Sequence, residues 1–215
     1  MKTEKQKIAQ TILLLRILHK DNNISGNLKL QKEVFLSELR LLNQKLGGLY
    51  YKYFRYTYGP YSKELAETLK SLADRGFVHK STYTLTERGT YFIEFVEAMI
   101  GDYRQNSKIL KVVDSTVKEY ERYSGPRLTN IVYELKVIPR DMPGEEMKVK
   151  DIPVFCDILV PEESEMAVNF EIPSQVLDDI KTELEIDMES WERMAERNPD
   201  SLKRAKQKLL AIAGG

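Results

Sequence analysis

The sequence predicts a mainly helical α+β protein, with a winged-helix-like N-terminal domain and a C-terminal extension of helices and short strands. The first observation is the order helix, helix, strand, helix, hairpin, helix across residues 1–100. The second is a proline-punctuated region over 137–172, which interrupts the helical pattern. The third is a composition of 42% hydrophobic and 31% charged residues, which suits a real core beneath a solvated surface. We place the domains at residues 1–100 and 101–215.

Two amphipathic helices open the chain. Residues 4–20 carry apolar side chains at helical spacing, and the turn-favouring run Asp21-Asn22-Asn23 should end this helix. Asn27 is the expected N-cap of a second helix over 28–43. Apolar residues cover a wide side of this second helix, so we expect it to be well buried.

A tyrosine-rich stretch follows the two helices. Six of the twelve tyrosines lie within residues 50–61. Aromatic and β-branched residues predict a strand over 52–58, which Gly59-Pro60 closes. Ser62 is the expected N-cap of a third helix because its hydroxyl can accept a hydrogen bond from a first-turn N–H group.

A short hairpin and a fourth helix complete the winged-helix order. Gly76 fits the left-handed position that follows many helix ends. Strands over 77–79 and 83–85 should form the hairpin, and Thr86 should cap a helix that reaches Met99.

The C-terminal extension contains helices on both sides of the 137–172 region. Short strands are expected at 154–160 and 168–172, and helices at 103–122, 126–135, 174–185, 188–197 and 199–210. A strand followed by helices superficially resembles a ribbon-helix-helix DNA-binding dimer, in which Asn169 and Glu171 would read bases. The surrounding acidity argues against DNA affinity, so we expect these elements to serve homodimer formation or packing.

The net charge of zero conceals two oppositely charged parts. Residues 1–90 contain 16 Lys and Arg against 8 Asp and Glu, a balance of +8. Residues 91–215 contain 17 against 25, a balance of −8. A basic part suits an acidic partner such as nucleic acid, but the two parts could equally neutralise each other.

Alternation along the tyrosine-rich strand divides its side chains between two faces. Tyr51, Tyr53 and Arg55 should point one way, and Phe54 and Tyr56 the other. One row should complete the core, and we expect the row with Tyr53 to face outward. Basic residues of the third helix and of the hairpin could add to this face. The candidate binding residues for a protein or nucleic-acid partner are Tyr51, Tyr53, Arg55, Lys63, Lys70, Lys80 and Arg88.

The sequence contains no recognisable catalytic, metal-binding or cofactor-binding signature. His19, His79 and Cys156 lie far apart and lack the spacing of a zinc site. Gly47-Gly48 lacks the lysine motif of a phosphate-binding loop. No secretory signal and no membrane-spanning apolar run is visible, so a cytoplasmic location is expected. We therefore expect a protein that is not an enzyme, with no cofactor and no metal.

Two local patterns resemble the Panacea antitoxin domain family, which includes phage-associated and toxin–antitoxin proteins. The first is Lys29-Leu30-Gln31-Lys32 followed by Val34-Phe35, and the second is the Tyr58-Gly59-Pro60 turn leading into a helix. Leu85-Thr86-Glu87-Arg88-Gly89 resembles a third motif of the family. The resemblance covers about residues 28–99 and departs from the family at Glu33, where an apolar residue is expected.

The resemblance implies a non-catalytic protein that neutralises a toxin by binding it, without metal or cofactor. Our leading hypothesis is accordingly an antitoxin-like or adaptor-like protein that engages a protein partner through its N-terminal domain. The alternative is a winged-helix transcriptional regulator that binds duplex DNA with its basic part. An enzyme is a third hypothesis, supported only by the otherwise unexplained region 137–172.

Overall fold

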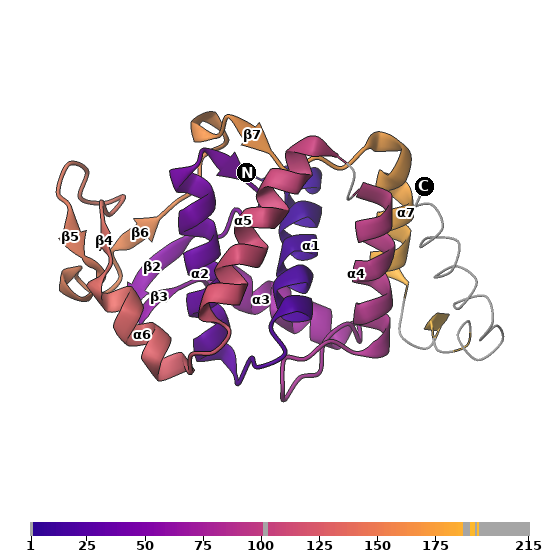
Figure 1. The fold of residues 1–215 in the computed structure, drawn as a ribbon, viewed down its shortest axis with the longest axis horizontal. Coiled ribbons are helices and arrows are strands. Elements are labelled where there is room, and N and C mark those ends of the chain that lie inside the picture. Colours follow the sequence, from indigo (N-terminus) through magenta and orange to yellow (C-terminus); the bar gives the residue numbers. More distant parts are fainter. Residues whose placement is uncertain (1, 101–102, 187–189, 192, 194–215) are drawn as a thin grey trace.

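The computed structural model describes residues 2–100, 103–186, 190–191 and 193 (Figure 1). Within these residues the fold is mainly helical α+β, as the sequence predicts. The helices are α1 (Glu4–Lys20), α2 (Asn27–Asn43), α3 (Lys63–Asp74), α4 (Glu87–Ile100), α5 (Arg104–Tyr120), α6 (Gly125–Glu134) and α7 (Ser174–Glu185), with short 3-10 turns η1 (Val149–Asp151) and η2 (Glu163–Glu165). The helices predicted at 188–197 and 199–210 lie largely or wholly outside the described residues.

The strands are short and form three small sheets. They are β1 (Leu46–Gly47), β2 (Tyr53–Tyr56), β3 (Gly59–Tyr61), β4 (Lys136–Val137), β5 (Met147–Lys148), β6 (Asp157–Leu159) and β7 (Val168–Asn169). Strand β2 lies between β3 and β6, and both pairings are antiparallel. Strand β1 pairs with β7 in parallel, and β4 pairs with β5. Two of these sheets therefore join residues 46–61 to residues 157–169.

Helix α2 lies at the centre of the molecule. It packs against α5 and α6, while α1 packs against α4 and α5, and α7 packs against α4. Figure 1 shows α4 and α7 at one end and the β3–β2–β6 sheet at the other. The buried apolar side chains from Ile8 to Leu184 form one cluster, to which both the first 100 residues and the later segment contribute.

Several predicted ends of elements are confirmed by hydrogen bonds. The Ser62 hydroxyl accepts from the N–H group of Leu65 at 3.2 Å, and the Thr86 hydroxyl accepts from that of Gly89 at 3.1 Å. Asp21 ends α1, and its N–H group donates to the Ile17 carbonyl. Gly76 has φ of 75°, the left-handed conformation that glycine adopts without steric penalty.

Other predicted elements are shorter than expected. Between the strands predicted over 77–79 and 83–85, the structure forms only an isolated bridge between Val78 and Leu85, so the predicted hairpin is reduced to a tight turn. The predicted strand 154–160 contributes only β6, and the predicted strand 168–172 only β7. The predicted N-cap Asn27 is the first residue of α2, and Gly26 precedes it without a side-chain cap.

Candidate functional site

Polar side chains of α2 hold the Gly-Pro turn in place. The Gln31 side chain donates to the Ser62 carbonyl at 3.0 Å and accepts from the Ser62 N–H group at 2.9 Å. The Lys32 ammonium donates to the Pro60 carbonyl at 2.8 Å. These three hydrogen bonds explain why the Lys29–Lys32 motif and the Gly59-Pro60 turn occur together, because one motif fixes the backbone of the other.

A buried charged cluster lies on the same helix. Lys29 forms an ion pair with Asp21 at 2.6 Å and donates to the carbonyls of Asn23 and Glu121 at 3.1 and 2.7 Å. Glu33 is fully buried beside Asp21. Burial and the neighbouring carboxylate raise the pKa of Glu33 to about 9, so its neutral form prevails at pH 7. A neutral carboxyl group is compatible with this apolar position of the helix.

The expected orientation of the tyrosine-rich strand is wrong. Tyr51 and Tyr53 are 0% exposed, and Arg55 is 9% exposed. The Tyr53 ring packs edge-on against Phe35 of α2, with 5.2 Å between ring centroids. Arg55 donates to the carbonyls of Val149 and Tyr56 and lies over the Tyr133 ring. Alternation separates the two rows as predicted, but the row with Tyr53 faces the core because α2 covers that side.

The other row belongs to an aromatic surface of exposed and half-buried rings. Phe54, Tyr56 and Tyr61 project from β2 and β3 and are joined there by Phe155, which precedes β6. The Phe54 ring stacks on the Phe155 ring, with 6.3 Å between their centroids. The centroid of the Tyr56 ring lies 6.0 Å from that of Phe155 and 5.6 Å from that of Tyr61. We call these four residues, together with Tyr58 of the β2–β3 turn, the aromatic surface.

Exposure of large apolar side chains is concentrated at this surface. Tyr56 is 44% exposed, Tyr58 64% and Phe155 71%. The other large apolar side chains that the structure describes as exposed are Tyr103, Ile138 and Val154. Val154 precedes Phe155, so four of these six lie in the β2–β3 hairpin or the loop before β6. Contiguous exposed apolar residues of this kind usually mark an interaction site.

The backbone presents Phe155 outward at a conformational penalty. Its φ is 69°, a value that bulky residues rarely adopt. The Phe155 N–H group donates to the Arg55 carbonyl at 2.7 Å, and the Arg55 N–H group donates to the Cys156 carbonyl at 2.8 Å. These two bonds hold the strained residue against β2. Strain at an exposed aromatic residue is typical of positions selected for function.

A pocket of 210 Å³ lies next to the aromatic surface, where the first turns of α2 face the β2–β3 hairpin. We call it the tyrosine pocket. Its lining residues are Asn27, Leu28, Gln31, Lys32, Tyr56, Tyr58, Gly59 and Tyr61. A Cβ atom at Gly59 would lie 3.4 Å from Lys32 Cε and 3.3 Å from the Tyr133 ring, and Gly59 has φ of +91°. Glycine therefore suits both the left-handed backbone and the tight packing at this position.

The remaining predicted binding residues do not form one cluster. Lys63, Lys70 and Lys80 are exposed on α3 and on the turn that follows it. Lys63 forms an ion pair with Glu67 at 3.6 Å, and Lys80 pairs with Asp74 at 2.8 Å.

The prediction that Arg88 faces a binding partner is wrong, because its side chain is 1% exposed. Its guanidinium lies over the Phe77 ring and donates to the carbonyls of Glu183 and Ile186 at 3.1 and 2.5 Å. It therefore holds the C-terminal end of α7 instead of facing a partner.

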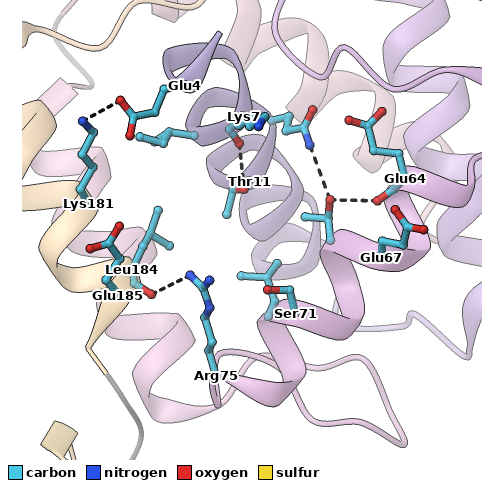
Figure 2. A pocket seen from close by; sticks show the side chains of 14 residues that line it. Glu4, Lys7, Thr11, Glu64, Glu67, Ser71, Arg75, Lys181, Leu184 and Glu185 are labelled. Carbon is cyan, nitrogen blue, oxygen red and sulfur yellow. Dashed lines mark hydrogen bonds and ion pairs between the residues drawn. The ribbon is translucent and has the colours of Figure 1, made fainter. Parts of the chain in front are cut away.

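A larger hollow of 430 Å³ separates α1 and α3 from α7 (Figure 2). Its charged lining residues are Glu4, Lys7, Glu64, Glu67, Arg75, Lys181 and Glu185. Lys181 forms an ion pair with Glu4 at 2.7 Å, and Arg75 donates to the Leu184 carbonyl at 3.1 Å. Because side chains of both charges line the hollow, it does not favour a ligand of either charge.

Sequence reasoning did not identify Phe155 as part of a site. It lies in the proline-punctuated region, and the Pro-Val-Phe run there reads equally well as a buried strand. Within the described residues, no group of three or more His, Cys, Asp or Glu side chains is arranged to hold a metal ion. None of the described helices is both long and apolar enough to cross a membrane.

Comparison with known proteins gives one distant similarity. The chain is similar to the uncharacterized protein YwgA of Bacillus subtilis (strain 168), with 25% identity over 141 residues. The match covers 57% of this chain and 81% of that protein. No protein-family model matches the chain, and no solved structure matches it. The Panacea resemblance therefore stays a prediction that rests on its short motifs.

Proposed function

We propose that this protein is a non-catalytic regulatory binding protein, antitoxin-like or adaptor-like, whose aromatic surface engages a protein partner in the cytoplasm. The proposal keeps a winged-helix-like role for the N-terminal part, with the β2–β3 hairpin as its binding element. The observation that carries it is the group of contacting rings formed by Phe54, Tyr56, Tyr61 and Phe155, of which Tyr56 and Phe155 are exposed and the other two half-buried.

The physical reason is the free energy gained when such rings are removed from water. Aromatic side chains bury large apolar areas, and tyrosine also offers a hydroxyl group for hydrogen bonding at the rim. Aromatic residues are therefore enriched among the few interface positions that dominate protein binding. Because β2 and β6 hold the rings on paired strands, little conformational entropy remains to be lost on binding.

The Panacea resemblance adds a suggestion about the partner. The motifs that carry it, around Gln31 and Pro60, build the turn between β2 and β3 and so fix the position of Tyr58. A toxin-like protein is the partner that the resemblance implies. Lys29–Lys32, Gly59 and Pro60 are buried and support the proposed surface, whereas Tyr58 of the second motif belongs to that surface.

DNA binding by the basic N-terminal part is less well supported. Phosphate contacts need accessible cations, and Arg88 is buried whereas Lys63 and Lys80 each pair with an acidic residue. The aromatic rings could stack on unpaired bases, yet among the described residues that line the adjoining tyrosine pocket only Lys32 is charged.

The test is affinity capture from the native host with the full chain as bait. Phe155→Asn combined with Tyr58→Ser should abolish recovery of a specific partner, because both rings leave the surface. Asparagine tolerates the left-handed backbone at position 155. The matched control is Tyr103→Ser, which removes an exposed ring far along the chain at the N-cap of α5, where serine is favoured.

Three outcomes decide the proposal. A partner lost by the double variant and kept by the control supports it. A partner kept by both variants, or recovery of duplex DNA with a steep salt dependence in place of a protein, contradicts it.

A further inference from the structure

Two lysines on the same helix, three residues apart, are both buried but differ in their partners. Lys29 is 1% exposed and Lys32 is 2% exposed. Lys29 forms an ion pair with Asp21 at 2.6 Å. Among the described residues, Lys32 forms no ion pair, and its ammonium donates one hydrogen bond, to the Pro60 carbonyl at 2.8 Å. Lys32 thus lacks the negative charge that Lys29 has.

A buried ammonium without a counter-charge is unfavourable. Burial removes its hydration, and the positive charge of Arg55 adds repulsion; together they lower the pKa of Lys32 to about 8. The charged form still predominates at pH 7. Buried charges in proteins are normally paired, so the missing partner requires an explanation.

Lys32 lines the tyrosine pocket, and no acidic residue is among the described residues that share this lining. Asn27 and three tyrosines also line the pocket, and amide and hydroxyl groups of these residue types can donate hydrogen bonds to an anion. Asn27 and Leu28 belong to the first turn of α2, whose N-cap makes no side-chain hydrogen bond. The partial positive charge of a helix N-terminus further favours an anion there.

We infer that the tyrosine pocket receives an acidic side chain of the protein partner, with the carboxylate paired to Lys32 and the adjacent apolar residues of the partner covering the aromatic surface. This inference rests on the proposed function and specifies the chemistry of the partner. The pocket volume of 210 Å³ suits a single side chain, because pockets for larger ligands usually begin at about 300 Å³.

The experiment uses benzoate as the probe and benzamide as its neutral isostere. Each is titrated into the full-length isotope-labelled protein at constant ionic strength, and the amide signals of Tyr58 and Gly59 are followed by NMR. Benzoate should bind at least about tenfold more tightly than benzamide, because only benzoate supplies a charge for Lys32. Lys32→Met should remove this preference, whereas Lys52→Met, which removes an exposed lysine just before β2, should leave it unchanged.

The pH dependence provides a readout that does not require a variant to fold. Benzoate affinity should fall as pH rises from 6.5 to 9, as Lys32 loses its proton. The other charged or titratable groups that face Lys32 are Arg55, Tyr133 and the three pocket tyrosines. Arginine and tyrosine side chains generally keep their charge over this range.

Equal affinities for the two probes, or a benzoate affinity that does not change with pH, would overturn the inference. The proposed function fails separately, through affinity capture. If the Phe155→Asn, Tyr58→Ser variant loses the partner but the wild-type protein shows no preference for benzoate, the proposed function stands and this inference is wrong.

Discussion

The two faces of β2 carry similar residues in different environments. On the inner face Tyr53 is fully buried against Phe35, and Arg55 donates to backbone carbonyls. On the outer face the rings of Phe54 and Tyr56 contact each other and the exposed ring of Phe155. The difference indicates that inner rings stabilise the fold and outer rings remain available for a partner.

The largest effect on stability is expected on the inner face. Tyr53→Ala should lower the free energy of unfolding by about 3–5 kcal/mol, the usual range for removing a buried aromatic ring. Tyr56→Ala, three residues along the same strand, should lower it by less than about 1 kcal/mol because its ring is 44% exposed. Denaturant titration measures both values.

Tyr53→Phe provides a control for the first prediction. The Tyr53 hydroxyl is buried without a hydrogen-bond partner among the described residues, so its removal should be neutral or slightly stabilising. A loss as large as that of Tyr53→Ala would show that the hydroxyl group, and not ring packing, determines stability here.

The next largest effect on stability is expected where the Gln31 side chain of α2 bonds to Ser62, just after the β2–β3 hairpin. Gln31→Leu should lower the free energy of unfolding by about 2–3 kcal/mol, because the Ser62 N–H and carbonyl groups lose their buried partners. The variant should also broaden the NMR signals of Tyr58. Unchanged stability would mean that water replaces the amide and that the motif is not needed for the turn.

A pH effect should originate from the buried carboxyl groups behind the inner face. Burial raises the pKa of Glu38 to about 8 and that of Glu33 to about 9, against an ordinary value of 4.5. The folded state therefore holds these protons more tightly than the unfolded chain does. Stability should fall as pH rises from about 4.5 towards 8 or 9.

Glu38→Gln should reduce this fall by at least about 1 kcal/mol between pH 5.5 and 8, because glutamine needs no proton to remain neutral. Unfolding titrations at both pH values measure the change. The control is Glu145→Gln on an exposed loop, which should reproduce the wild-type fall. If the stability of Glu38→Gln falls with pH as much as that of the wild-type protein, the raised pKa assigned to Glu38 is wrong.

The smallest effect is expected at the exposed lysines of α3 and its following turn. Lys63→Ala and Lys80→Ala each remove a surface ion pair and should change the free energy of unfolding by less than about 0.5 kcal/mol. Partner binding should also be unchanged. A large loss of partner or nucleic-acid binding would move the functional site from the aromatic surface to α3.

Much of the helical framework could be predicted from sequence because its signals are local. Ser62, Thr86 and Gly76 act on neighbouring backbone groups, and their predicted roles are confirmed. The orientation of β2 could not be predicted, because alternation separates two rows without showing which one α2 covers. Tyr53 and Tyr56 are the same residue type, so composition does not distinguish them.

The candidate site was harder to predict because its parts are distant in sequence. Phe155 reaches Phe54 only through the pairing of β2 with β6. Similarly, the sequence suggests that Arg88 is an exposed cation, because the carbonyls at the end of α7 that accept its hydrogen bonds lie almost 100 residues further along the chain. Long-range contacts such as these determine which rings form the aromatic surface and which predicted binding residues are buried.

The most direct test of the aromatic surface is site-specific photo-crosslinking in the native host. A benzophenone amino acid replaces Tyr58 in one strain and Tyr103 in another, since both positions are exposed. The account predicts a specific crosslinked protein from position 58 and none from position 103. The same protein crosslinked equally from both positions, or from position 103 alone, would contradict the assignment of binding to the aromatic surface.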